Sequence, residues 1–379
     1  MNLIMSDAAR AELFAYQAQQ AEMNNITISA LSSRFSVQPA VQQRFENASK
    51  ESHDFLQKVN SIGVTEQKGE KVLLDTTGPV ARTNSSYDGT NRRNPLNVVD
   101  MKARRYECEQ VNYDTFISYP QLDMWAGHPD FQLRVSRQIA RQVALDRIMT
   151  GFNGTHHAEV SDIKKHPRLE DVNKGWLQDI RDQAPQRVMK DVMLTARNMD
   201  NSVAYTGRYA NPDALVQDAR SSLLDEWHKD ADDLVVIMGR NLFNSLRLPV
   251  LNSISMQNAN AELLAGQLIV STRTIGGLDV YLAPFFPAQS MLITSFSNLS
   301  VYWQKGSMRR LMKDEPEYNR IAIYQSVNDC YVVEDHGKCA LIENISFAEY
   351  DHDAPDWYRD ATKALSAQAE DRDAGEEED

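Results

Sequence analysis

Residues 63–119 constrain the fold more than any other part of the sequence. Stretches on both sides of this segment alternate polar and apolar residues, as in KVLLDTTGPVART and YECEQVNYDTFISY, and a polar tract, NSSYDGTNRRNP, separates them. Such alternation around a polar connection predicts an extended β-hairpin with a large tip. The tip has too few apolar side chains to fold against a core of its own. We therefore expect it to become ordered against neighbouring molecules.

The other elements predict an α+β protein. Helices are expected at 8–23, 48–59, 129–150, 173–183, 211–227 and near 240–247 and 261–266. From about 278 to 347 short β-branched stretches separated by Gly, Asn or Asp predict strands of five to seven residues. This order of elements favours α+β over a doubly wound parallel sheet, and the 379 residues are enough for two or three modules.

The helix at 129–150 has the clearest signal. Pro129 and Asp130 suit its first turn, and apolar residues recur every four positions along one side. Those residues are Phe131, Val135, Ile139 and Val143. A second side carries Arg134, Arg137 and Arg141, which form either a solvated face or a stripe of ion pairs between subunits.

The charge balance restricts what the chain binds. Forty Lys and Arg residues against 53 Asp and Glu give a formal charge of −13, which opposes tight non-specific binding to nucleic acid. A container with this charge encloses nucleic acid without a basic arm. The like-charged end, EDRDAGEEED, predicts disorder over residues 351–379. No apolar run is long enough to cross a bilayer, and we expect neither export by a signal peptide nor a membrane partner.

Catalytic motifs do not occur in the sequence. It contains no Walker loop, no GxGxxG after a strand, no HExxH and no GxSxG. Two sets of residues remain as alternatives for metal or thiol chemistry: His156, His157 and His166 beside Glu159 and Asp162, and Cys108, Cys330 and Cys339. A solvated polar loop and reduced, half-buried thiols explain them more simply. We expect no catalytic, cofactor or metal site and no enzyme.

Eight collinear stretches carry a more specific signal. They are RYECEQVNYDTFISY, LDMWAGHPDFQLRV, LDRIMTGFNGTHHAEVSD, DVNKGWLQDIRDQAPQRVM, DLVVIMGRNL, FFPAQSMLIT, NLSVYWQKGSMRR and YVVED. In order and spacing they resemble the P-two-like (peduovirus) major capsid proteins of tailed phages, over roughly residues 10–347. The first 30 or so residues match loosely, and the acidic end has no counterpart.

The resemblance implies the Hong Kong 97-type capsid fold and its division of the chain. The implied parts are an amino-terminal arm at 1–60, an extended hairpin loop at 63–119, a peripheral domain at 120–169 and 298–328 with the spine helix 129–150, an axial domain at 170–297 and 330–347, and an acidic tail at 351–379. The family also implies loss of an amino-terminal segment of about 35 residues on maturation, with a cut near Phe35.

The implied function is a major capsid protein that assembles into an icosahedral head shell around double-stranded DNA. Its implied partners are other copies in pentamers and hexamers, an internal scaffold, a maturation protease, the portal protein and non-specifically packaged DNA. The protein is made in the host bacterial cytoplasm and resides in the virion. Another phage structural or assembly protein, or an enzyme with an unrecognised site, is the alternative.

Two further expectations concern residues of the hairpin. We expect Arg92 and Arg93 at the tip, together with the helix arginines, to meet carboxylates of other subunits; solvation of the tip pair is the alternative. Some shells of this fold crosslink covalently between Lys and Asn. Lys68 and Lys71 lie in the hairpin, but no nearby carboxylate is evident and we expect no crosslink.

Overall fold

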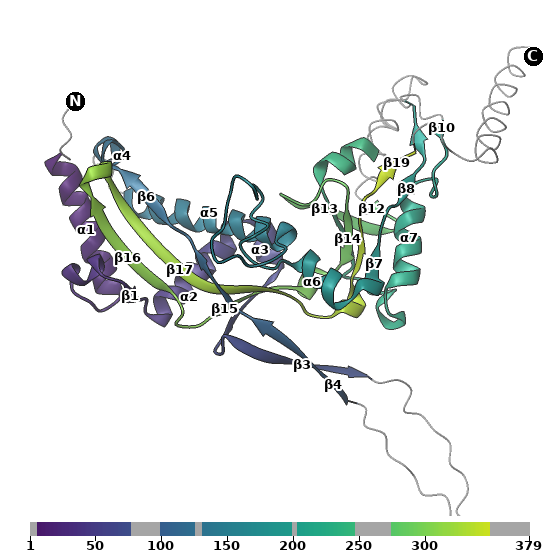
Figure 1. Ribbon diagram of the computed structural model, residues 1–379, viewed down its shortest axis with the longest axis horizontal. Helices are drawn as coiled ribbons and strands as arrows, with labels where there is room; N and C mark the ends of the chain where they lie inside the picture. The colour runs from purple at the N-terminus through teal and green to yellow at the C-terminus, as the bar shows by residue number, and fades with distance from the viewer. Residues whose placement is uncertain (1–5, 77–98, 126–130, 199–202, 247–273, 349–379) are drawn as a thin grey trace, which may run out of the picture. The chain divides into compact units, whose positions relative to one another are not determined.

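The computed structural model describes residues 6–76, 99–125, 131–198, 203–246 and 274–348. By their internal contacts these residues form two compact units, Met1–Gly175 with Leu299–Asp335 and Trp176–Asn298 with His336–Asp379. Each unit has its own sheet and helices, and the α+β class predicted from the sequence is confirmed (Figure 1).

A seven-stranded sheet forms the centre of the first unit. Its main path runs β1-β16-β17-β15-β2, and β5 and β6 also pair with β17. The bounds are β1 Phe35–Ser36, β2 Asn60–Val64, β5 Glu109–Asn112, β6 Thr115–Ser118, β15 Leu299–Gln304, β16 Arg309–Glu315 and β17 Arg320–Val333. Strand β17 contacts four other strands, so it organises the whole sheet.

Strand β17 is longer than the sequence predicted. The pattern predicted two short strands, RIAIYQSV and CYVVED, separated by Asn328 and Asp329, whereas the structure has one strand of 14 residues. Asp and Asn usually weaken strands because they favour turns. Here Asp329 is buried and bonded to an arginine of a neighbouring helix, which removes that penalty.

Helices cover the sheet of the first unit. They are α1 Asp7–Met23, α2 Pro39–Glu51, α3 Asp54–Lys58, α4 Tyr119–Trp125 and α5 Phe131–Asn153, with the 3₁₀ turns η1 Ile28–Ser32 and η5 Pro316–Tyr318. Figure 1 shows α1 beside β16, where Tyr16 packs against Tyr119, Leu122 and Met312. The sequence predicted a helix only from 48, but α2 begins at Pro39 because proline suits the first helical turn.

The hairpin consists of β3 Lys68–Thr76 and β4 Val99–Glu107. The two strands pair antiparallel from Lys68↔Glu107 to Thr76↔Val99. The hairpin is therefore shorter than the segment 63–119 predicted from the sequence, because the residues of β5 and β6 pair with β17 instead. The expected tip, with Arg92 and Arg93, lies outside the described residues.

Helix α5 ends where a long loop passes close to it. A Cβ atom added to Gly154 would lie 2.1 Å from the backbone oxygen of Asn173, so only glycine fits there. The helix itself buries Val143, Ile148 and Phe152. The predicted apolar side is therefore partly correct. Val143 is buried, whereas Val135 and Ile139 are half-buried and pack against the apolar cluster that contains Tyr119 and Leu122.

The second unit contains a six-stranded sheet in the order β12-β13-β11-β14-β18-β7. Its elements are α6 Trp176–Gln183, η2 Pro185–Arg187, β7 Val188–Met189, β8 Met193–Leu194, β9 Ala196–Arg197, β10 Val203–Tyr205, α7 Pro212–Leu223, η3 Glu226–His228, β11 Val235–Met238, β12 Thr274–Ile275, β13 Leu278–Leu282, β14 Met291–Thr294, η4 Phe296–Asn298, η6 His336–Lys338, β18 Ala340–Ile342 and β19 Ser346–Phe347. The centre of the sheet is fully buried, with all four residues of β14 inaccessible to solvent.

Helix α7 is shorter than its pattern predicts. Leu215 and Ala219 are buried as expected, but the helix ends at Leu223 and Trp227 is 61% exposed. Arg187 bonds to the carbonyl of Leu223 and to Asp225, which holds the chain in its new direction. Residues 240–246 are helical as predicted. The expected helix at 261–266 and the acidic tail lie outside the described residues.

Candidate functional site

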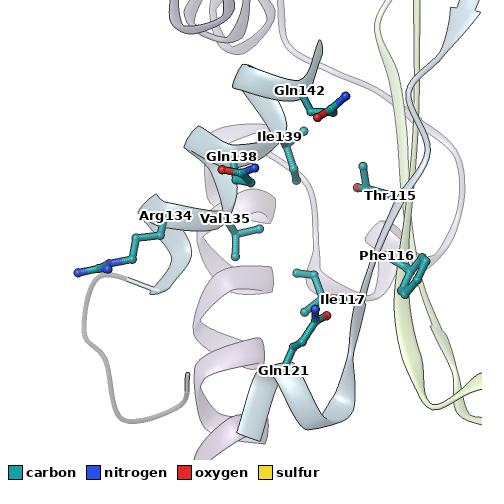
Figure 2. Close-up of a pocket in the computed structure, with 9 residues that line it drawn as sticks. All are labelled: Thr115, Phe116, Ile117, Gln121, Arg134, Val135, Gln138, Ile139 and Gln142. Carbon is teal, nitrogen blue, oxygen red and sulfur yellow. The ribbon is translucent and has the colours of Figure 1, made fainter. Parts of the chain in front are cut away.

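A groove of about 540 Å³ opens between the first half of α5, the start of α4 and strand β6. Figure 2 shows the side chains that line it: Thr115, Phe116, Ile117, Gln121, Arg134, Val135, Gln138, Ile139 and Gln142. Val135, Ile139 and Ile117 supply apolar surface. The amides of Gln121, Gln138 and Gln142 supply donors and acceptors.

The groove has the chemistry of a contact surface. Among the described residues that line it, Arg134 is the one charged side chain, and none is a carboxylate, histidine or cysteine. General acid–base catalysis requires such a titratable group in hydrogen-bond reach of the reacting atom. Phe116 is 57% exposed, and the Arg320 guanidinium lies 5.0 Å from the centre of its ring. The mixture of apolar surface and amides suits a polypeptide ligand.

Strand β6 gives the groove one further property. Among the described residues its single strand neighbour is β17, so its second edge carries no strand partner there. Unpaired strand edges present backbone donors and acceptors to an incoming extended segment. The groove therefore combines side-chain contacts with an edge for strand addition.

A buried ion network holds α5 in position. The Arg147 guanidinium donates to both oxygens of Glu46 in α2, at 2.5 and 3.1 Å. The same guanidinium donates to both oxygens of Asp329 in β17, each at 3.1 Å. All three side chains are at most 4% exposed. One arginine thus joins α2, α5 and the central strand β17.

Neutral groups complete the network. The Tyr113 hydroxyl donates to Asp329 at 3.0 Å, and the Asn173 amide donates to the backbone carbonyl of Asp329 at 2.8 Å. Burial raises the pKa of Tyr113 well above its usual value, so its hydroxyl keeps its proton. The buried carboxylate of Asp329 thus accepts hydrogen bonds from both Arg147 and Tyr113, which is the condition for a buried ion pair to persist.

The pKa values in the network follow from burial and pairing. Burial by itself lowers the pKa of Arg147, but Asp329 and Glu46 reverse this and raise it well above the usual range. For Glu46 burial is the larger effect, and it raises the pKa in spite of the attraction to Arg147. Two carboxylates share one guanidinium, so the protonated form of Glu46 is stabilised.

The structure separates the arginines of α5 by role. Arg134 lines the groove, and Arg137 and Arg141 are exposed on the same helix. Arg147, which the sequence analysis did not single out, is buried. The apolar pattern around it could have indicated this, because it lies in one buried stripe with Ala140, Val143, Ala144 and Ile148. A charged residue in such a stripe must find partners.

The described candidates for metal and thiol chemistry contact groups of the protein itself. The rings of His156 and His166 lie 5.9 Å apart, and His157 bonds to the carbonyl of Val172 at 2.7 Å. Within the described ranges no group of three His, Cys, Asp or Glu side chains is arranged to hold a metal. Lys68 pairs with Glu107 across the hairpin, while the side chain of Lys71 lies outside the described part. Cys108 and Cys330 are buried with their sulfurs 3.4 Å apart, a proximity that their spacing in sequence does not indicate.

No helix in the described residues has both the length and the apolar character needed to cross a bilayer.

Comparison with known proteins gives consistent matches. Residues 12–345 match the family described as phage major capsid protein, P2 family. The major capsid protein of Serratia phage KSP20 is 48% identical over 339 residues, 89% of this chain and 97% of that protein. The capsid proteins of Escherichia phage P2 are 40% identical over 349 residues, 91% and 97% of the two chains. A chain of the satellite phage P4 procapsid with its size determination (Sid) protein aligns with a TM-score of 0.70 at 36% identity, covering 92% of this chain and all of that one.

Arg147→Ala should destabilise the protein by about 3–5 kcal/mol, because two buried carboxylates lose their shared cation. Arg137→Ala on the exposed side of the same helix is the matched control, and its effect should stay within about 0.5 kcal/mol. Urea unfolding followed by tryptophan fluorescence measures both values. Equal effects of the two substitutions would contradict the assignment of Arg147 as the central cation.

Glu46 should make stability depend on pH. Its folded pKa lies above the unfolded value of 4.5, so its contribution is complete below that value and is lost as pH rises through the folded pKa. Glu46→Gln, which stays neutral, should flatten the profile over this window. Denaturation midpoints between about pH 4 and 8 test this, with Glu51→Gln at the exposed end of α2 as control. Parallel profiles for the wild type and Glu46→Gln would show the pKa assignment to be wrong.

Proposed function

Because this chain belongs to the P2 family of phage major capsid proteins, we propose that the groove between α4, α5 and β6 receives the hairpin of a neighbouring copy as the shell forms. The protein is a structural subunit of the phage capsid in the virion and not an enzyme. Its fold is the Hong Kong 97-type capsid fold, as the sequence resemblance predicted.

The hairpin has the reach that such a contact requires. Its strands pair over nine positions, and at about 3.3 Å per residue they extend roughly 30 Å from Lys68 and Glu107. A two-stranded ribbon without a sheet partner is marginally stable in water. Among the described residues β3 and β4 pair only with each other. A second copy would supply the missing surface.

The groove offers what an extended segment needs. The unpaired edge of β6 supplies backbone hydrogen bonds, and Phe116, Val135 and Ile139 supply apolar contacts for alternate side chains. Each contact is modest. A subunit held on several sides nevertheless gains stability from effective concentration, while weak single contacts allow misplaced copies to leave. Closed pentamers and hexamers would then set the curvature of the shell.

The division of the chain into functional parts is also a proposal. We assign 1–60 to the amino-terminal arm, 63–119 to the hairpin loop, 120–169 and 298–328 to the peripheral domain, 170–297 and 330–347 to the axial domain and 351–379 to the tail. The chain passes from one compact unit to the other at Gly175/Trp176, Asn298/Leu299 and Asp335/His336. These positions lie near the proposed boundaries between the peripheral and axial domains and support them.

We also propose partners beyond the chain itself. The P4 procapsid neighbour contains a size determination protein, which supports a scaffold or size-determining partner for this shell. A maturation protease that cuts near Phe35, and a portal protein, complete the proposed assembly. The charge of −13 supports packaging of DNA without tight binding to the wall, since negative protein does not retain negative DNA.

Phe116→Glu should lower the yield of closed particles about tenfold or more, the effect of losing a contact worth ~1.4 kcal/mol. The side chain is 57% exposed in the subunit, so the substitution leaves the fold intact. Val160→Glu, at a residue 86% exposed outside the groove, is the matched control. Electron microscopy of particles from cells that coexpress the scaffold and protease counts the yield.

Charge reversal of Arg92 and Arg93 tests a separate proposed contact, in which these residues meet carboxylates of another subunit, and it should also lower the yield. Normal particle yield with Phe116→Glu would remove the groove from the account, and normal yield with the reversed arginines would remove the carboxylate contact. Loss with Phe116→Glu and Val160→Glu alike would show that any added charge prevents assembly, and the groove would have no special role.

A further inference from the structure

Two cysteines from distant parts of the sequence meet at the root of the hairpin. Cys108 lies between β4 and β5, and Cys330 lies in β17. Their sulfur atoms are 3.4 Å apart although 222 positions separate them in the chain. Cys108 is fully buried and Cys330 is 5% exposed.

The register of the sheet leads to the two cysteines. The antiparallel ladder of β5 and β17 ends at the pair Glu109↔Asp329, and the same register continued by one position would set Cys108 opposite Cys330. Residues opposite each other on antiparallel strands have Cα atoms about 4.5–5.5 Å apart. A disulfide requires Cα atoms about 4.4–6.8 Å apart, a range that this register would meet, and the sulfur atoms are already 3.4 Å apart.

The backbone groups of Cys108 bond to Gln67. Its backbone N–H donates to the carbonyl of Gln67 at 2.8 Å, and its carbonyl accepts from the Gln67 side chain at 3.1 Å. Both groups are therefore used away from Cys330. Side chains at positions that exchange no backbone hydrogen bonds approach most closely across a sheet, which explains the short sulfur–sulfur distance.

We propose that Cys108 and Cys330 are an oxidisable thiol pair that closes to a disulfide when a small peroxide reaches the shell, and so fixes the root of the hairpin to the central strand β17. One thiolate attacks the peroxide oxygen, forming a sulfenic acid and releasing hydroxide. The second thiol attacks that sulfur and releases water. In total two thiols and one hydrogen peroxide give one disulfide and two waters.

The location of the pair suggests when this occurs. A capsid subunit is made in a cytoplasm that keeps thiols reduced, and it meets oxidants after the particle leaves the cell. The hairpin would thus remain adjustable during assembly and become fixed afterwards. Tyr106 and Tyr302 pack beside the pair, with ring centres 5.3 Å apart, and restrict access to small oxidants.

Peptide mapping of purified, assembled particles tests the proposal. After treatment with hydrogen peroxide, non-reducing mass spectrometry should find the peptide of Cys108 joined to that of Cys330, at a mass lower by two hydrogen atoms. Dithiothreitol should reverse the change. Cys339 is the internal control: it is also fully buried, its sulfur bonds to the carbonyl of His336, and it should remain a free thiol.

Thermal unfolding provides a second readout. Oxidation should raise the unfolding temperature by about 5 °C or more in the wild type and in Cys339→Ser, because the link constrains the unfolded chain. Cys108→Ser and Cys330→Ser should show no rise. Comparison of the oxidised and reduced wild type needs no variant, so poor folding of a serine variant leaves the test intact.

Links between subunits, irreversible sulfinic acid at Cys330, or equal oxidation of Cys339 would overturn the inference. The thiol chemistry depends on the fold of a single subunit and not on docking of the hairpin. Closed particles in which Cys108 and Cys330 stay free thiols under peroxide would therefore refute the proposed disulfide. They would leave the proposed assembly contact unaffected.

Discussion

Arg147 is the residue on which the arrangement of the first unit depends. Its guanidinium bonds to Glu46 of α2 and to Asp329 of β17, and it belongs to α5, the helix that forms one wall of the groove. A guanidinium suits this place because its fixed fork of donors can satisfy two carboxylates at once. Removal of Arg147 leaves two carboxylates away from water without their cation, which is far more costly than a lost surface contact.

This network explains how one subunit combines a firm body with an adaptable contact. The body holds Phe116, Val135 and Ile139 at fixed positions, because α5 is joined to β17 and β6 pairs with β17. Firm presentation lowers the entropy that a partner must lose on binding. In the proposed assembly the hairpin is the complementary part, since its strands pair with each other over nine positions. Its root is close to the same central strand, through Cys108 and Cys330.

Local patterns were sufficient for some of these features. The four-residue repeat of Val135, Ile139 and Val143 predicted α5, and alternation around a polar tract predicted the hairpin. The network was not predictable in this way, because Glu46 and Asp329 lie 101 and 182 positions from Arg147. Distance in the sequence also explains two wrong predictions. Asp329 was predicted to interrupt a strand, because its partner Arg147 is far away in the chain. The helix at 211–227 was predicted to be longer than α7, because no local pattern indicates the bonds that Arg187 makes to Leu223 and Asp225.

A map of the assembled shell by electron microscopy tests the central claim, that the hairpin of one copy docks in the groove of another. The account predicts that the hairpin built on β3 and β4 of one subunit contacts Phe116, Val135 and Ile139 of its neighbour, alongside the edge of β6 that carries no strand partner in the described residues. A closed shell in which this groove is empty, or is filled by the hairpin of its own subunit, would contradict it.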